Sequence, residues 1–166
     1  MSRTFNVLVL CTGNSARSIL GEMLFSHLGQ GRIKAWSAGS KPGGVVNPVA
    51  LETLAKHGVP CEGARSKSWD EFNASAVPPA PSFDFIFTVC GNAAAETCPI
   101  WPGHPTTAHW GIPDPAHVEP MAARRAAFEE AYQSLKKRIE AFLALPLETM
   151  TPQESALAAR RIHTGD

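Results

Sequence analysis

The sequence predicts a single α/β domain, built on an open parallel sheet of about four strands with helices on both faces. Apolar runs of strand length alternate along the chain with segments of helical periodicity, which is the pattern of a parallel sheet with crossover helices. The 166 residues fit one domain, and 44% of them are hydrophobic. A chain of this composition can bury a core without disulfides or a structural metal.

Four segments have the pattern of buried strands. The first, at residues 5–10, is a nearly continuous apolar run, as expected for a strand covered on both faces. Residues 33–36 form a shorter run that ends at Ala38-Gly39. Two further strands are predicted within residues 83–89 and 106–112. In such sheets ligands bind at the carboxyl ends of the strands, so the residues that follow each run are the candidates for a site.

The helices are predicted from apolar spacing and from residues typical of helix ends. Leu20, Leu24 and Leu28 recur at helical spacing before Gly29, and Asn47-Pro48 is a typical start for a second helix. Residues 121–145 are predicted to form a long amphipathic helix, whereas residues 93–103 are ambiguous because prolines interrupt the alanines.

We assign residues 1–146 to the main domain and residues 147–166 to a C-terminal extension. Thr151 to Glu154 match a capping box, so the extension is expected to hold a short helix with a thin apolar stripe.

Charge and hydropathy exclude several classes of function. Lys and Arg number 15, as do Asp and Glu, so neither nucleic acid nor an anionic membrane is expected as the main partner. No apolar run has the length of a membrane span or the form of a signal peptide, so we expect a cytoplasmic protein. In that reducing compartment cysteines more often serve catalysis or metal binding than permanent disulfides. The four cysteines are Cys11, Cys61, Cys90 and Cys98.

A C-x5-R pair, Cys11 and Arg17, lies between the first strand and the first helix. Successive N–H groups of such a loop, together with the helix dipole, can hold a tetrahedral oxyanion, and the guanidinium can add two parallel hydrogen bonds. Gly13 permits unusual backbone angles in this loop. The positive surroundings should favour a nucleophilic thiolate, with Ser15 and Ser18 donating to the sulfur. The alternative is a buried cysteine that only ends a strand. The predicted oxyanion-binding residues are Thr12, Gly13, Asn14, Ser15, Ala16 and Arg17.

Two other places carry candidate chemistry. Asp114, held between two prolines, could protonate a leaving oxygen, although an aspartate at this position could also simply accept a hydrogen bond from the backbone of its own turn.

Cys90 and Cys98 suggest thiol–disulfide exchange. Zinc, with His104 or His109 as further ligands, is the rival interpretation, and the third is that neither thiol reacts; Cys61 is expected to be inert. The seven-residue gap lacks the usual zinc spacing, so no metal site is predicted.

Four motifs stand out along the chain: CTGNSARS at 11–18, SAG at 37–39, TVC at 88–90 and HWGIPDP at 109–115. Taken together, they resemble the arsenate reductases built on the low-molecular-weight protein tyrosine phosphatase fold. The resemblance spans residues 5–145, and the added thiols at Cys90 and Cys98 favour the reductase branch over the phosphatases.

The resemblance implies a mechanism with no cofactor. Cys11 attacks the arsenic of arsenate, the loop holds the oxygens, and Asp114 protonates the departing hydroxide. Cys90 then attacks Cys11 and releases arsenite, and Cys98 moves the disulfide to Cys90–Cys98. Thioredoxin is the expected reductant, with glutathione and glutaredoxin as the alternative, and phosphate or sulfate should compete with arsenate.

The resemblance also bears on a cation site and on other functions. Some family members bind potassium beside the loop, at positions that Asn14, Glu22 and Ser37 match. Lys67 stands where they have an aspartate, so we expect its ammonium to replace the ion. A phosphotyrosine phosphatase is the alternative enzyme, although Ala116 stands where such phosphatases usually carry an aromatic ring. A non-catalytic oxyanion sensor is the third hypothesis.

Overall fold

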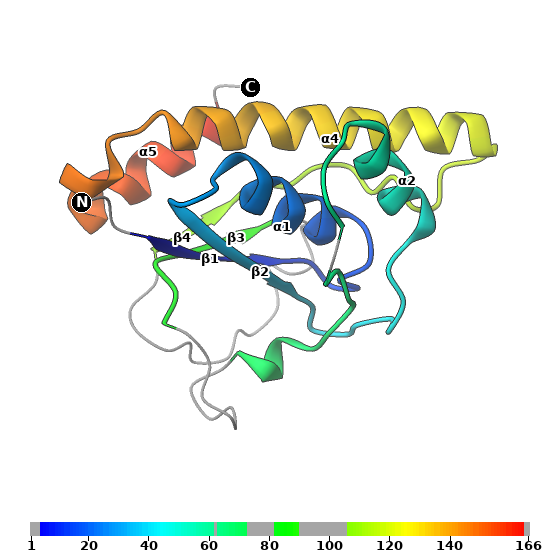
Figure 1. The fold of residues 1–166 in the computed structure, drawn as a ribbon, viewed down its shortest axis with the longest axis horizontal. Helices are drawn as coiled ribbons and strands as arrows, with labels where there is room; N and C mark the ends of the chain where they lie inside the picture. The colour runs from blue at the N-terminus through cyan, green and yellow to red at the C-terminus, as the bar shows by residue number, and fades with distance from the viewer. Residues whose placement is uncertain (1–3, 62, 73–81, 90–105, 165–166) are drawn as a thin grey trace.

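The computed structural model describes residues 4–61, 63–72, 82–89 and 106–164. Its four strands form one sheet in the order β2-β1-β3-β4, and every neighbouring pair is parallel (Figure 1). The predicted open parallel sheet is therefore confirmed. The strands are β1 (Phe5–Leu10), β2 (Ile33–Ala38), β3 (Phe85–Thr88) and β4 (Thr106–His109).

Strand β1 lies inside the sheet, which explains its nearly continuous apolar sequence. Val7 and Val9 point to one side and join the main core, while Leu8 and Leu10 point to the other and join a smaller cluster around Phe72. Because both faces of β1 are covered, a polar side chain at any position from Val7 onward would be buried away from water, which would lower the stability of the fold.

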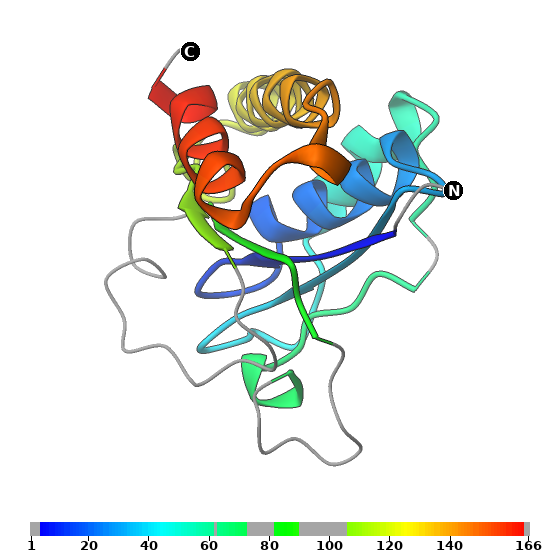
Figure 2. The same ribbon diagram turned by 90° about the vertical axis from the view of Figure 1, so that its left-hand side faces the viewer.

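The helices of the main core lie on one face of the sheet. Figures 1 and 2 show α1 and α4 on that face with α2 beside them, while η1 (Trp69–Glu71) lies on the opposite face. Among the described helices, none combines the length and apolarity needed to cross a membrane. The helices are α1 (Arg17–Leu28), α2 (Pro48–Lys56), α4 (Met121–Leu143) and α5 (Pro152–Thr164), with the short η2 (Leu147–Thr149) before α5.

The expected helix starts have the expected hydrogen bonds. The Asn47 side chain accepts from the N–H of Val49, with Pro48 at the first helical position of α2. In the capping box, Glu154 N–H donates to Thr151 Oγ1 over 3.1 Å and Thr151 N–H donates to Glu154 Oε1 over 2.8 Å. The tail is better packed than its thin apolar stripe suggested, because Ala159 is completely buried.

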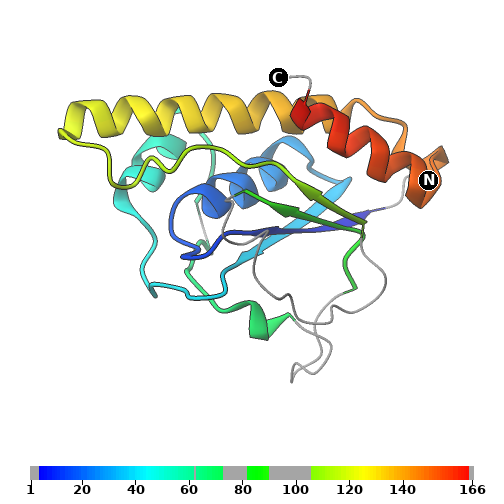
Figure 3. The same cartoon turned by 180° about the vertical axis from the view of Figure 1, so that it is seen from behind.

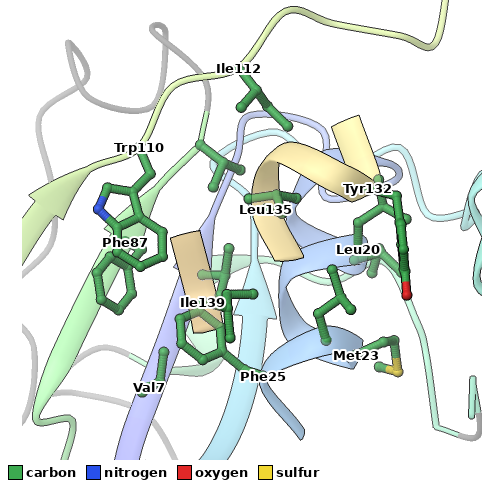
Figure 4. Close-up of a cluster of buried hydrophobic side chains, with 14 of the residues drawn as sticks. Val7, Leu20, Met23, Phe25, Phe87, Trp110, Ile112, Tyr132, Leu135 and Ile139 are labelled. Atoms are coloured by element: carbon green, nitrogen blue, oxygen red, sulfur yellow. The ribbon is translucent and has the colours of Figure 1, made fainter. Parts of the chain in front are cut away.

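An aromatic cluster anchors the chain where it leaves β4 (Figure 4). The ring of Trp110, fully buried, lies 4.1 Å from that of Phe87, which in turn stacks on Phe25 at 5.4 Å. Strand β4 ends at His109, three residues earlier than predicted, yet the chain continues beside β3. Trp110 N–H donates to Thr88 O, and Ile112 N–H donates to Val89 O. These contacts set the path of the segment that leads to Asp114.

Candidate active site

The loop between β1 and α1 has its carbonyl groups turned away from its centre. The carbonyl oxygens of Thr12, Gly13 and Ser15 accept hydrogen bonds at 3.0, 3.1 and 2.8 Å from backbone N–H groups between β2 and α2. In a trans peptide, a C=O and the N–H of the next residue point in opposite directions. The N–H groups that follow these carbonyls therefore face the inside of the loop. The three donors are Lys41, Gly43 and Asn47.

The inside of this loop suits an oxyanion. Helix α1 begins at Arg17 with no side-chain cap on its first N–H groups, so the positive end of its dipole faces the loop. Cys11 lies at the end of β1 with only 5% of its surface exposed. The predicted order of strand, loop and helix is thus present, with Cys11 directly after β1 and Arg17 at the start of α1.

Asn14, not Gly13, supplies the unusual backbone angle of the loop. Its φ is +46°, in the left-handed region, whereas Gly13 has no positive φ. Gly13 therefore does not use the conformational freedom of glycine to reach this region. Asparagine tolerates this region better than most residues, and here its buried side chain is bonded on all sides. Asn14 Nδ2 donates to Ser18 Oγ (2.8 Å) and Ser37 Oγ (3.0 Å), and Oδ1 accepts from Lys67 N–H (2.8 Å).

Ser18 belongs to this buried network. Its hydroxyl, which was predicted to donate to the Cys11 sulfur, accepts from Asn14. An accepting hydroxyl keeps its own proton for another partner, so the predicted role is compatible with the contact but stays a prediction.

A buried ion pair lies behind the network. Lys67 Nζ is 3.6 Å from Glu22 Oε1, 3.5 Å from Ser37 Oγ and 3.1 Å from Arg65 O. Burial raises the pKa of Glu22 and lowers that of Lys67, while their mutual attraction opposes both changes. The ammonium thus lies beside Glu22 and Ser37, two of the three residues that the resemblance connects with a cation, while the third, Asn14, accepts from the Lys67 backbone N–H. Sequence reasoning could find Lys67 only through that resemblance, because a single lysine in a polar stretch carries no other signal.

We expect Lys67→Met to lower the free energy of unfolding by about 3 kcal/mol at pH 7, because it leaves the Glu22 carboxylate buried without its cation. The loss should be smaller at pH 5, since the pKa of Glu22 is already raised and its protonation removes the uncompensated charge. Urea unfolding at both pH values measures this. The double variant Glu22→Gln/Lys67→Met should be more stable than the single one; equal stability would contradict an electrostatic cause.

Gly39 explains why the SAG motif is beside the anion loop. A Cβ at this position would lie 2.4 Å from Thr12 O and 2.7 Å from Cys11 O, closer than any real contact. Both neighbours are backbone atoms, which cannot move aside without displacing the loop. Only glycine therefore permits the close approach of the residues after β2 to the residues after β1.

Arg17 and Asp114 meet at the mouth of the loop. Arg17 Nη1 donates to Ile112 O over 3.1 Å, and Nη2 lies 3.7 Å from Asp114 Oδ2. The Asp114 side chain is 43% exposed, and its Oδ1 accepts from Ala116 N–H over 2.9 Å. One oxygen therefore bonds the turn, as the alternative interpretation expects, and the other faces Arg17, while the role of Asp114 as a proton donor stays a prediction. A guanidinium has five N–H donors, so Arg17 retains donors for an anion.

Several predicted residues are outside this arrangement. Cys90, Cys98 and His104 lie outside the described residues. His109 Nδ1 lies 2.8 Å from Thr88 Oγ1, and Cys61 contacts the carbonyl of Val59 at 3.5 Å. Within the part of the chain that the structure describes, no group of three or more potential ligands among His, Cys, Asp and Glu could hold a metal ion.

The parallel sheet, with the Cys11–Arg17 loop between β1 and α1, defines a phosphatase-like α/β protein. The low molecular weight phosphotyrosine protein phosphatase family matches residues 6–155, so the chain belongs to this family. The match extends ten residues beyond the expected end of the resemblance at residue 145 and includes the start of α5.

Among its relatives are arsenate reductases. The chain is 33% identical over 134 residues to the arsenate reductase of Shouchella clausii, covering 80% of this chain and 91% of that protein. The crystal structure of arsenate reductase from Archaeoglobus fulgidus superposes with a TM-score of 0.58 at 29% identity, covering 81% of this chain and 98% of the other. A tyrosine phosphatase, AmsI of Erwinia amylovora, shares the fold with a TM-score of 0.58 at 23% identity, over 83% of this chain and 90% of its own. The fold alone therefore does not separate reductase from phosphatase.

Proposed function

We propose that this protein reduces arsenate to arsenite, with Cys11 as the nucleophile and residues 1–146 as the reductase domain. The observation that carries the proposal is the juxtaposition of the Cys11 loop, Arg17 and the carboxylate of Asp114 at one edge of the sheet. Relatives of about one-third identity, such as that of Shouchella clausii, are arsenate reductases and support the choice of arsenate. The absence of an aromatic ring after Pro115 supports it over phosphotyrosine.

In the first step, Cys11 forms a bond to arsenic. Arg17 and the inward N–H groups hold the oxygens of the tetrahedral anion and stabilise the charge that develops on them. Asp114 donates its proton to the departing oxygen, which leaves as water. Asp114 suits this role because its Oδ2 lies 3.7 Å from Arg17 Nη2, beside the group that would hold the anion.

The second step transfers two electrons and needs a second thiol. The Cys90 thiolate attacks the sulfur of Cys11, the sulfur–arsenic bond breaks, and its electron pair stays on arsenic. Arsenic is thereby reduced from the +5 to the +3 state while two thiols are oxidised to one disulfide. Cys98 then attacks this bond and forms Cys90–Cys98, which frees Cys11. An external dithiol such as thioredoxin restores the two thiols; glutathione with glutaredoxin is the alternative donor, and either suits a cytoplasmic enzyme.

The experiment that tests this function is a single-turnover assay with fully reduced protein and no added reductant. We expect about one arsenite per protein molecule, because each relay can supply two electrons once. Hydrolysis of p-nitrophenyl phosphate without any arsenite would show a phosphatase instead. Phosphate binding with neither reaction would show an oxyanion sensor, and either result would overturn the proposal.

Arg17→Lys should raise the inhibition constant of phosphate at least about tenfold, because an ammonium keeps the charge but cannot form two parallel hydrogen bonds. Inhibition of the arsenate reaction by phosphate measures this. Arg125→Lys is the matched control, since Arg125 pairs with Glu52 on the surface, more than half exposed and far from the loop in sequence. Equal inhibition constants for wild type and Arg17→Lys would show that Arg17 does not hold the anion.

A further inference from the structure

Helix α5 makes direct contacts with the segment that leaves β4. The indole Nε1–H of Trp110, fully buried, donates to the carbonyl of Ala159 in α5 over 2.9 Å. Arg160 donates to the Thr107 carbonyl on β4 from both Nε (3.2 Å) and Nη2 (3.0 Å). Figures 2 and 3 show α5, in red, beside β4.

The position of β4 in the sheet makes these contacts important. Strand β4 is at the edge, paired on one side with β3, so its outer carbonyl groups need other partners. Arg160 supplies two N–H groups to one of them. From the other side, Arg138 of α4 donates to the carbonyls of Trp110 (3.0 Å) and Gly111 (3.3 Å). The segment 110–111 is therefore held between α4 and α5.

This held segment leads directly to the anion site. Ile112, the next residue, offers the carbonyl that accepts from Arg17 Nη1. Arg17 in turn lies 3.7 Å from Asp114. A displacement of Trp110 would move the Ile112 carbonyl and so change the direction of the guanidinium.

We propose that α5 is a positioning element of the active site: through Trp110 it holds the Ile112 carbonyl that orients Arg17 toward the bound oxyanion. The inference rests on the proposed function only in that Arg17 binds the anion. Most of α5, which runs to Thr164, lies beyond the end of the family match at residue 155. The extension 147–166 would thus act on the site without touching the substrate.

The test measures phosphate binding by calorimetry, which does not depend on arsenate chemistry. Two variants disturb α5: deletion of residues 152–166, and Ala159→Leu, which adds volume where Ala159 has no exposed surface. We expect phosphate to bind about three- to tenfold more weakly to each, the effect of one weakened charged hydrogen bond. Leu157→Ala is the control on the same helix, since Leu157 is 51% exposed, and should leave the affinity unchanged.

Urea unfolding of each variant separates positioning from general stability. At a temperature where the variants are folded, a helix that only stabilises the protein would lower the unfolding free energy and leave the phosphate Kd unchanged; that result would overturn the proposal. A double-mutant cycle adds a second criterion. When Arg17→Lys is already present, Ala159→Leu or the deletion of residues 152–166 should change the Kd for phosphate less than about twofold. An equal change in both backgrounds would show that α5 does not act through Arg17.

If the deletion variant fails to fold, the test uses Ala159→Leu together with the nuclear magnetic resonance signal of the Trp110 indole N–H. In a spectrum of 15N-labelled protein, Ala159→Leu should shift the Trp110 Nε1–H resonance together with the loss of affinity, and a shift without any loss would overturn the proposal. The single-turnover assay is independent of these binding measurements. If the α5 variants bind phosphate more weakly but wild type releases no arsenite, the reductase function alone is rejected. If wild type releases arsenite but the α5 variants bind phosphate as well as wild type does, the role of α5 alone is rejected.

Discussion

Cys11→Ser is expected to abolish arsenate reduction and to leave the fold intact. Serine has nearly the same shape, so it fits the buried site where Cys11 has 5% of its surface exposed. Its hydroxyl stays protonated at neutral pH and cannot attack arsenic as a thiolate does. Loss of a nucleophile typically lowers the rate by several orders of magnitude. The measurement is arsenite release per protein molecule with and without a reductant.

Phosphate binding is the control for Cys11→Ser. The inward N–H groups and Arg17 do not depend on the sulfur, so the affinity for phosphate should stay within about threefold of wild type. A variant that binds phosphate and still reduces arsenate at more than about one per cent of the wild-type rate would contradict the assignment of Cys11 as the nucleophile.

The second large effect concerns Cys98→Ser. We expect it to release about one arsenite and then stop, trapped with a Cys11–Cys90 disulfide, because no thiol remains to move that bond. Cys90→Ser should release none, since no neighbouring thiolate can attack the Cys11 adduct. In wild type, arsenate should instead accumulate a Cys90–Cys98 disulfide that thioredoxin reduces. Peptide mapping of the unreduced proteins identifies each disulfide.

Cys61→Ser is the matched control for the relay. Burial raises the pKa of the Cys61 thiol, and its sulfur lies 3.5 Å from the Val59 carbonyl, so it has neither the charge state nor the position of a reactive thiol. Its substitution should leave multiple turnover unchanged. Full turnover of Cys98→Ser with thioredoxin would reject the three-cysteine relay. Activity restored only by glutathione and glutaredoxin would assign the protein to the branch that uses small thiols.

The strands and helices could be predicted because their signals are local. The apolar run of β1, the Asn47-Pro48 start of α2 and the capping box of α5 each depend on residues a few positions apart. The position of the loop from Cys11 to Arg17 was predictable for the same reason, since both residues belong to one turn between a strand and a helix. Element ends were less certain: strand β4 stops at His109 although the chain continues beside β3.

By itself, the sequence determined the parallel sheet, the loop from Cys11 to Arg17 between its first strand and helix, and the family, because hydrophobic periodicity and loop motifs are properties of neighbouring residues. Only the tertiary structure decided that Asn14 carries the left-handed angle, because Ser37 and Lys67, the partners that hold it, are 23 and 53 residues away. It also decided that Arg17 donates a hydrogen bond to a carbonyl 95 residues away. Such bonds depend on where folding brings distant backbone groups, and backbone carbonyls look alike in every sequence.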